Sequence, residues 1–264
     1  MRGNKIIVVI LCALLLFEAL AFASVSLDQQ KALADESTFY STASDGFLET
    51  SDSTYANAHG AANAILLSDS SDTLSIGQVL LPPFYVDRGA LFFDTSSLPD
   101  SVVITSATLS LYGWADISTT DFDITVVGGS LLNNPLVASD YGDLLTQTTS
   151  GGVFNTAGFL VGGYNDIPLN LAGLGWISKT GMTKFGLRSS RDITALAPTG
   201  TDMVVVVPYE GGVGFRPMLV VTYVYPPTSV PTLSQWGMIG MGILLAAALA
   251  WSIRRRWIVS TDKS

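Results

Sequence analysis

The clearest structural signal in this chain is the stretch Val102-Val-Ile-Thr-Ser-Ala-Thr-Leu-Ser-Leu-Tyr-Gly-Trp114. In its second half Ala107, Leu109 and Leu111 alternate with polar or larger side chains, so that the two sets would face opposite ways. A period of two residues is typical of a β-strand that buries one of its faces. The stretch therefore predicts a strand that lies against a hydrophobic core.

Similar segments recur on both sides of this stretch, and turn residues separate them. Strands are expected at 45–50, 73–81, 85–93, 122–126, 167–172, 183–188, 203–207 and 218–225. Pro82-Pro83 and Gly128-Gly129 interrupt the pattern, since proline cannot donate to a sheet and paired glycines favour turns. Residues 136–145 predict a short helical turn. Residues 24–44 are expected to be a lead-in to the β-domain, with 24–36 loose or in a short helix. The pattern predicts an all-β fold, a jelly-roll β-sandwich.

Residues 1–23 have the layout of a removable signal peptide. A basic start at Arg2 and Lys5 precedes an apolar run, and the small residues Ala21 and Ala23 place cleavage before Ser24. The alternative is a permanent N-terminal membrane helix, but the apolar run is short for that role. We therefore expect signal peptidase to cut the chain during export.

A second apolar segment lies near the C-terminus. Residues 237–253 contain no charged side chain, and a basic tail, Arg254, Arg255 and Arg256, follows directly. A helix of this length spans roughly 25 Å, close to the ~30 Å hydrocarbon core of a bilayer. Arginines beside a membrane segment stay in the cytoplasm. A single transmembrane helix would thus hold the body outside the cytoplasm through the proline-rich linker 226–231.

The residues before this helix resemble the IPTL-CTERM sorting signal, a relative of the PEP-CTERM signals of Gram-negative bacteria. The motif residues are Val230, Pro231, Thr232, Leu233, Ser234, Gln235, Trp236 and Gly237. Val230 stands where the family usually has Ile, and Gln235 where it usually has Glu. Motif, helix and basic cluster follow one another over 230–256 as in the family. The resemblance implies cutting by an exosortase-type protease and transfer from the inner membrane to the cell surface or medium; the alternative is an uncut anchor.

Composition limits the function of the body. The chain has 13 basic and 22 acidic residues, a formal net charge of −9, which argues against nucleic-acid binding. The single cysteine, Cys12, lies in the signal peptide, so the mature body has no thiol chemistry. His59 is the single histidine, and no G-x-S-x-G motif accompanies it. We interpret His59 as structural or surface-lying and expect a protein that is not an enzyme.

The body also resembles the DNRLRE family over about 45–225. The resemblance is carried by Arg88-Gly-Ala-Leu-Phe-Phe-Asp-Thr-Ser-Ser-Leu-Pro99, Ile104-Thr-Ser-Ala-Thr-Leu-Ser-Leu-Tyr112, Thr180-Gly-Met-Thr-Lys-Phe-Gly-Leu-Arg-Ser-Ser-Arg-Asp192 and Arg216-Pro-Met-Leu-Val-Val-Thr-Tyr223. The family's naming hexapeptide is kept only as the core Phe185-Gly-Leu-Arg188. The resemblance implies a secreted β-jelly roll related to disaggregatase-type modules, some of which bind acidic polysaccharides.

Several residues are candidates for ligand contacts. The candidate glycan contacts are Tyr112, Trp114, Trp176, Arg188 and Arg191, because flat rings suit the C–H faces of sugars and arginines suit uronic acids. The alternatives are that the rings fill the sandwich ends and the arginines pair with nearby aspartates. Likewise, Arg88 and Asp94 form either a sugar-binding edge or a buried arginine that serves loop carbonyls and a carboxylate.

No cofactor is expected; a structural calcium ion is the one alternative, with Asp116, Asp121 and Asp123 as oxygen ligands. The sequence as a whole indicates an exported, surface-sorted, non-catalytic β-sandwich protein of the cell surface or extracellular matrix that binds polysaccharide. Two alternatives remain. One is a polysaccharide lyase or glycoside hydrolase on a jelly-roll scaffold. The other is a purely structural surface or floc protein, which would lack an exposed aromatic platform.

Overall fold

The structure is a computed structural model that describes residues 34–226, 237, 240–248 and 250–251. Residues 34–226 belong to one compact unit, and the described tail residues are helical. Among the described residues, no helix has both the length and the apolar character needed to cross a membrane. The helix expected over 237–253 is described only in part, and the expected signal peptide, 1–23, lies outside the described residues.

The body is all-β, as the sequence predicts. Within residues 34–226 the strands are β1 (Ala34–Tyr40), β2 (Gly46–Asp52), β3 (Leu66–Ser68), β4 (Leu74–Leu80), β5 (Phe84–Asp94), β6 (Val103–Asp116), β7 (Asp123–Gly128), β8 (Gly152–Asn155), β9 (Tyr164–Pro168), β10 (Met182–Ser189), β11 (Thr201–Val206) and β12 (Met218–Val224). Short helices lie between them: α2 (Tyr55–His59), α3 (Asp140–Leu145), α4 (Leu171–Gly175), α5 (Ser190–Ile193), and the 3-10 turns η1 (Thr156–Gly158) and η2 (Tyr209–Gly211).

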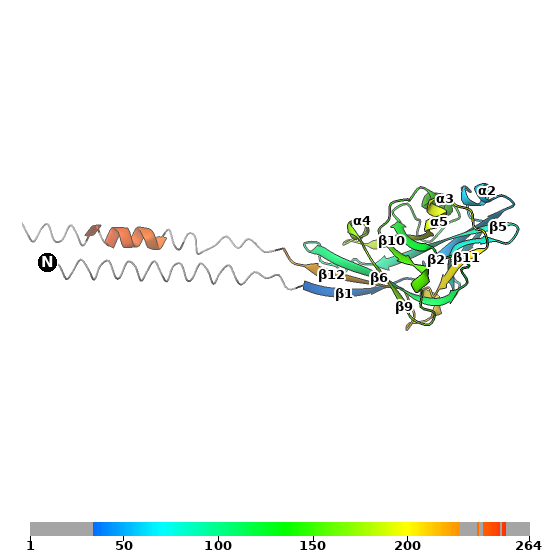
Figure 1. The fold of residues 1–264 in the computed structure, drawn as a ribbon. Helices are drawn as coiled ribbons and strands as arrows, with labels where there is room; N and C mark the ends of the chain where they lie inside the picture. Colours follow the sequence, from blue (N-terminus) through cyan, green and yellow to red (C-terminus); the bar gives the residue numbers. More distant parts are fainter. Residues whose placement is uncertain (1–33, 227–236, 238–239, 249, 252–264) are drawn as a thin grey trace, which may run out of the picture. The chain divides into compact units, whose positions relative to one another are not determined.

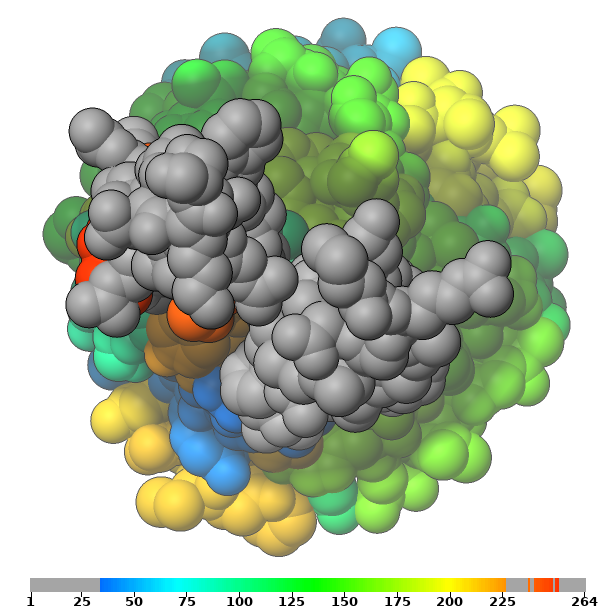
Figure 2. Space-filling view, turned by 90° about the vertical axis from the view of Figure 1, so that its left-hand side faces the viewer, coloured from blue at the N-terminus to red at the C-terminus, as the bar shows by residue number. Residues whose placement is uncertain are grey.

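The strands form one curled antiparallel sheet in the order β1-β12-β6-β11-β4-β5-β10-β7-β8. β9 pairs with β6, while β2 pairs with β5 and also carries β3. β6 is the longest strand: it pairs with β12 along its first part and with β11 at its end. In Figures 1 and 2, β1 (blue) lies against β12 (orange-brown), as the register Ala34↔Val224 requires.

The main core lies inside the curl of this sheet. Alternating side chains of β6, such as Leu109 and Leu111, are fully buried there, as their spacing predicts. Leu91 and Phe93 of β5 and Phe185 of β10 pack into the same cluster. The hydrophobic residues of several distant strands thus share one interior.

A second core covers the opposite face of β5, β7 and β10. Phe92 and Val127 point there and pack with Tyr141 and Leu144 of α3. Figure 1 shows α2, α3 and α5 gathered on this side of the sheet. Because both faces of these strands are covered, residues 90–93 of β5 form an unbroken apolar run instead of a strictly alternating pattern.

Two of the predicted secondary-structure elements differ from those in the structure. The expected lead-in is wrong at residues 34–40, because Ala34–Tyr40 is strand β1 of the sheet and not a loose or helical segment ahead of it. This edge strand buries only Phe39, so its sequence lacks the apolar alternation that identifies a strand. The strand expected at 167–172 instead ends at Pro168, and α4 begins at Leu171 after the Asn170 side chain caps its first turn.

Candidate functional site

The site begins where β6 meets β11. Val205 pairs with Ala115 and Val206 pairs with Gly113, so Trp114 is the extra residue of a bulge in β6. A bulge bends a strand and redirects the side chain at that point. The Trp114 side chain is 61% exposed, although tryptophan is usually well covered in folded proteins.

Gly113 fixes the loop beside this tryptophan. A Cβ atom at this position would lie 2.1 Å from the carbonyl oxygen of Leu160, so a larger residue could not be accommodated without moving the backbone. The close approach allows Gly113 to donate its N–H to Gly163 O at 2.9 Å and to accept the N–H of Gly162 at 2.8 Å. The 160–163 loop is thereby held against β6.

Two other rings extend the aromatic surface. Tyr112 and Phe215 have ring centroids 4.7 Å apart, and Tyr112 meets Tyr164 edge to face at 5.3 Å. The Tyr112 hydroxyl donates to Gly162 O at 2.9 Å. Phe215 is 44% exposed and comes from the loop between η2 and β12. Tyr112 is therefore held in place from two sides, while Phe215 and Trp114 remain accessible.

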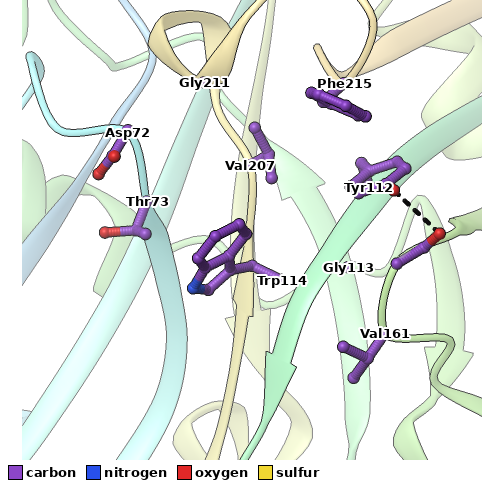
Figure 3. A pocket seen from close by; sticks show the side chains of 10 residues that line it. Asp72, Thr73, Tyr112, Gly113, Trp114, Val161, Val207, Gly211 and Phe215 are labelled. Atoms are coloured by element: carbon purple, nitrogen blue, oxygen red, sulfur yellow. Dashed lines mark hydrogen bonds between the residues drawn. The ribbon is translucent and has the colours of Figure 1, made fainter.

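Together these residues line a pocket of about 320 Å³. The lining residues are Asp72, Thr73, Tyr112, Gly113, Trp114, Val161, Gly162, Val207, Gly211 and Phe215. In Figure 3, Trp114 lies between Asp72 and Thr73 on one side and Tyr112 and Phe215 on the other. The volume is at the lower end of the ~300–1,000 Å³ typical of small-molecule sites. An aromatic floor with a few polar groups at its edge can hold a small ring by stacking and hydrogen bonding.

The charge around the pocket is negative. Asp72 is the lining residue with a carboxylate, and no lysine, arginine or histidine of the described residues lines the pocket. Glu210 adjoins the lining residue Gly211, but burial, together with the charge of Asp69, raises the pKa of Glu210 and so disfavours its charged form. Arg216 stacks 3.6 Å above the ring of Tyr209 and donates Nε to that residue's carbonyl oxygen, so its planar face is already engaged.

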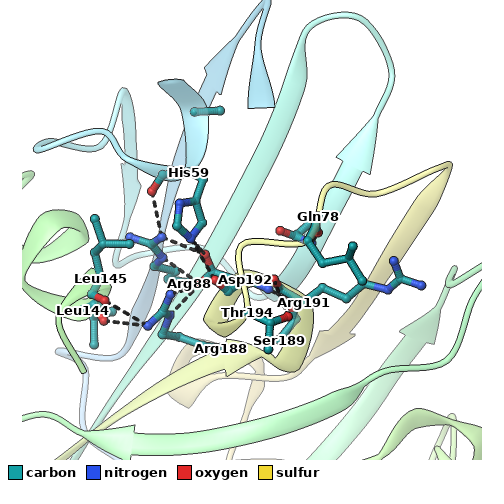
Figure 4. Close-up of polar contacts among 12 residues, drawn as sticks. His59, Gln78, Arg88, Leu144, Leu145, Arg188, Ser189, Arg191, Asp192 and Thr194 are labelled. Carbon is teal, nitrogen blue, oxygen red and sulfur yellow. Dashed lines mark hydrogen bonds and ion pairs between the residues drawn. The ribbon is translucent and has the colours of Figure 1, made fainter. Parts of the chain in front are cut away.

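The arginines singled out in the sequence lie elsewhere, in a buried cluster beneath α2, α3 and α5 (Figure 4). The carboxylate of Asp192 accepts from Arg88 Nη2 at 2.7 Å and from Arg188 Nε at 2.6 Å. All three side chains are fully buried. The remaining arginine N–H groups donate to the carbonyl oxygens of Tyr141, His59, Leu144, Leu145 and Gln147.

This cluster is electrostatically stabilised. Burial alone would raise the pKa of Asp192, but the hydrogen bonds and charges of Arg88 and Arg188 outweigh burial and lower it. Arg88 also lies 3.9 Å above the ring of Tyr141. The cluster therefore joins β5, β10 and the helices that cover them, and its role is structural.

Two of the candidate glycan contacts are corrected by this arrangement. Arg188 has no exposed surface, so it cannot meet a sugar on the outside. Arg191 pairs with the buried Asp202 at 3.5 Å, as the alternative interpretation holds. Arg88 likewise serves a carboxylate and loop carbonyls, but its partner is Asp192; Asp94 is exposed and accepts from Ser96 instead.

The candidate aromatic residues separate into two groups. Trp176 is half-buried and packs against the main core, over Gly128 and Gly151. Tyr112 and Trp114 line the pocket. No pattern in the sequence pointed to Asp72, Thr73 or Phe215, which come from loops far from residue 114 in the chain.

The calcium ligands expected at Asp116, Asp121 and Asp123 are not brought together. Asp116 accepts from Ser118 N at 2.9 Å, Asp121 from the Thr156 hydroxyl and Asp123 from Asn155 Nδ2 at 2.7 Å. Across the described part of the chain, no three His, Cys, Asp or Glu side chains form a group able to hold a metal ion.

His59 ends α2 beside the arginine cluster. Its Nε2 lies 2.8 Å from Asp192 O and 3.4 Å from Asp192 Oδ1, and its side chain is 16% exposed. It is absent from the lining of the Trp114 pocket. This position agrees with the structural interpretation of His59.

Comparison with known families adds information about the tail. A family described as the IPTL-CTERM motif matches residues 228–256, which confirms the resemblance noted for 230–256. The match indicates an exported protein that is sorted to the surface, and it is consistent with processing by a sorting protease. No curated protein matches the chain. Motif residues 230–236, Arg254–Arg256 and the expected cleavage residues Ala21, Ala23 and Ser24 lie outside the described residues.

Proposed function

We propose that this protein is a non-catalytic polysaccharide-binding domain displayed at the cell surface or in the extracellular matrix. The observation that carries the proposal is the exposed indole of Trp114 within an aromatic-lined pocket. Sugar rings present C–H faces that pack on flat aromatic rings, and their hydroxyls need polar groups nearby, such as Asp72 and Thr73. A purely structural surface protein has no need of such a platform.

The resemblance to DNRLRE domains supports the same role. We propose that the curled sheet is a jelly roll of that kind, with the binding pocket at the end of β6. The proposal does not transfer the acidic ligand of some relatives, because Arg188 is buried here.

A non-catalytic role fits the chemistry of the pocket. Glycoside hydrolysis requires two carboxyl groups on either side of the bond that breaks. The pocket lining contains one, Asp72, and His59 is engaged with Asp192. This arrangement supports binding in preference to the lyase or hydrolase alternative.

Binding is tested with the Trp114→Ala variant. Removal of the stacking surface is expected to weaken glycan binding at least tenfold, about 1.4 kcal/mol, while thermal stability stays close to that of the wild type because the side chain is exposed. Glycan-array screening followed by titration calorimetry measures the change. Tyr225→Ala is the matched control, since Tyr225 is an exposed aromatic residue outside the pocket lining. Unchanged binding by Trp114→Ala would show that the site is elsewhere.

The proposed export and cleavage steps are tested by measuring the intact mass of the mature protein. We propose that signal peptidase cuts before Ser24, that residues 237–253 cross the inner membrane of a Gram-negative cell, and that an exosortase-type protease cuts near Val230–Gly237. The surface form should then have an intact mass that lacks both ends. Replacement of Pro231, Thr232 and Leu233 by alanine is expected to leave the tail attached and the protein in the membrane fraction. Recovery of a shortened protein from this variant would count against recognition of the motif.

A further inference from the structure

We infer that the Trp114 pocket selects uncharged sugars and discriminates against acidic polysaccharides. The inference rests on the proposed function and specifies the ligand class of the same site. It departs from the expectation drawn from Arg188 and Arg191, which pointed to uronic acids.

The first step concerns the cations that a uronate would need. Arg88 and Arg188 are fully buried, and both donate to the Asp192 carboxylate. Their other N–H groups are directed to backbone carbonyl oxygens of the covering loops. Arg191 is held by Asp202. None of the three lines the pocket, so none offers the bidentate contact that recognises a carboxylate.

The second step concerns the charges that a ligand would meet. The carboxylate that a ligand would meet is that of Asp72, which is exposed and lines the pocket. Asp116, which is also exposed, follows Trp114 by two residues in the chain. Arg216 is the cation nearest to Phe215 in the chain, and it is stacked on Tyr209. Like charges that approach within a Debye length, ~8 Å at physiological ionic strength, repel one another. A chain of uronic acids would bring a carboxylate to each sugar unit and would be repelled here.

The third step concerns hydrogen bonding. An ionised carboxylate only accepts hydrogen bonds, so Asp72 requires donors from the ligand. The hydroxyls of a sugar supply these donors, and in a uronate one of these hydroxyls is replaced by an ionised carboxylate that can only accept. The Tyr112 hydroxyl already donates to Gly162 O, and the Thr73 hydroxyl lies 3.0 Å from that of Ser71. The accessible part of the pocket therefore consists of the rings of Trp114 and Phe215 beside an acceptor, Asp72.

The test compares two sets of oligosaccharides on the full chain in a polyoxyethylene detergent, which has no sugar headgroup. One set contains neutral oligomers of glucose, mannose, xylose and galactose, and the other contains oligomers of mannuronate, guluronate and galacturonate. Each oligosaccharide is titrated into the wild type, Trp114→Ala and Asp72→Lys, once at low salt and once at about 0.3 M salt, where charge interactions are screened.

We expect the wild type to bind at least one neutral oligomer at least tenfold more tightly than any uronate oligomer. This binding should change less than twofold with salt and should be lost in Trp114→Ala. Asp72→Lys should weaken neutral binding and gain at least tenfold in uronate binding, and that gain should disappear at high salt. Asp72 is exposed, so this variant is expected to fold.

Other outcomes would distinguish a failure of the proposed selectivity from a failure of the proposed glycan binding. Uronate oligomers that bind the wild type more tightly than neutral ones, through Trp114, would overturn the selectivity and leave glycan binding in place. Binding by neither set would overturn the proposed function together with the selectivity. Concentration-dependent self-association that is abolished by Trp114→Ala would identify a second copy of the chain as the occupant and would overturn both.

Discussion

Asp192→Asn is expected to destabilise the body by about 3–5 kcal/mol, because it leaves two buried guanidinium groups without a countercharge. The side chains of Asp192, Arg88 and Arg188 have no exposed surface, so water cannot solvate the two arginine charges that remain. For a domain of this size such a loss corresponds to a fall in Tm of roughly 10 °C. Differential scanning calorimetry and urea unfolding measure the effect.

The control is Asp94→Asn, which removes a carboxylate from the end of the same strand as Arg88. Asp94 is exposed and accepts hydrogen bonds from Ser96, so its replacement is expected to change stability by no more than about 0.5 kcal/mol. Similar losses in the two variants would contradict the buried cluster. In the Asp192→Asn background, Arg188→Met should cost less than in the wild type, since it removes an uncompensated charge.

The second large effect concerns Asp45, a fully buried residue in the turn between β1 and β2. Burial raises the pKa of its carboxyl group to about 8, since contacts with the Ser41 hydroxyl and the Phe92 N–H offset only part of the cost of burial. In the unfolded chain the same group ionises near 3.8. Between these two values the folded state therefore holds a proton that the unfolded state has lost.

The direction of the pH effect follows from this difference. The contribution of Asp45 to stability is fully present below about pH 4 and is lost as the pH rises towards 8. The difference between the two pKa values corresponds to roughly 6 kcal/mol. Asp45→Asn keeps an oxygen that can accept the Phe92 N–H at its present 3.0 Å position but cannot ionise. Urea unfolding at pH 5 to 8 should show the wild type losing several kcal/mol relative to this variant as the pH rises.

Parallel pH profiles for the wild type and Asp45→Asn would contradict this account of Asp45. The comparison is made as a difference between the two proteins because other acids titrate as well. Burial raises the pKa of Asp87 well above its ordinary value, with a further contribution from Glu49 on the paired strand. That contribution is common to both proteins and cancels.

Much of the strand pattern could be predicted from the sequence. The predicted segments 73–81, 85–93 and 183–188 correspond to β4, β5 and β10, because each contains enough apolar residues to reveal a buried face. The helical turn expected at 136–145 contains α3. β1 could not be found in this way, since a polar edge strand depends on β12 for its hydrogen bonds rather than on its own side chains.

The candidate site was predicted only in part. Trp114 and Tyr112 were selected by residue type, and the structure places both at one pocket. Trp176 was selected by the same reasoning and packs against the core. Residue type alone could not separate these cases, because the exposure of a ring depends on the loops that surround it.

The β class of the body and the sorting signal of the tail follow from the amino-acid sequence alone. Both are local properties of the chain. A two-residue period, or a motif that is followed by an apolar segment and arginines, can be recognised without knowing which residues are neighbours in space. The pairing of Asp192 with two arginines in the interior, and the meeting of Phe215 and Asp72 with Trp114 at the surface, become visible only in the folded molecule. These groups are brought together by pairing between distant strands, and that pairing is set by the packing of the whole sheet.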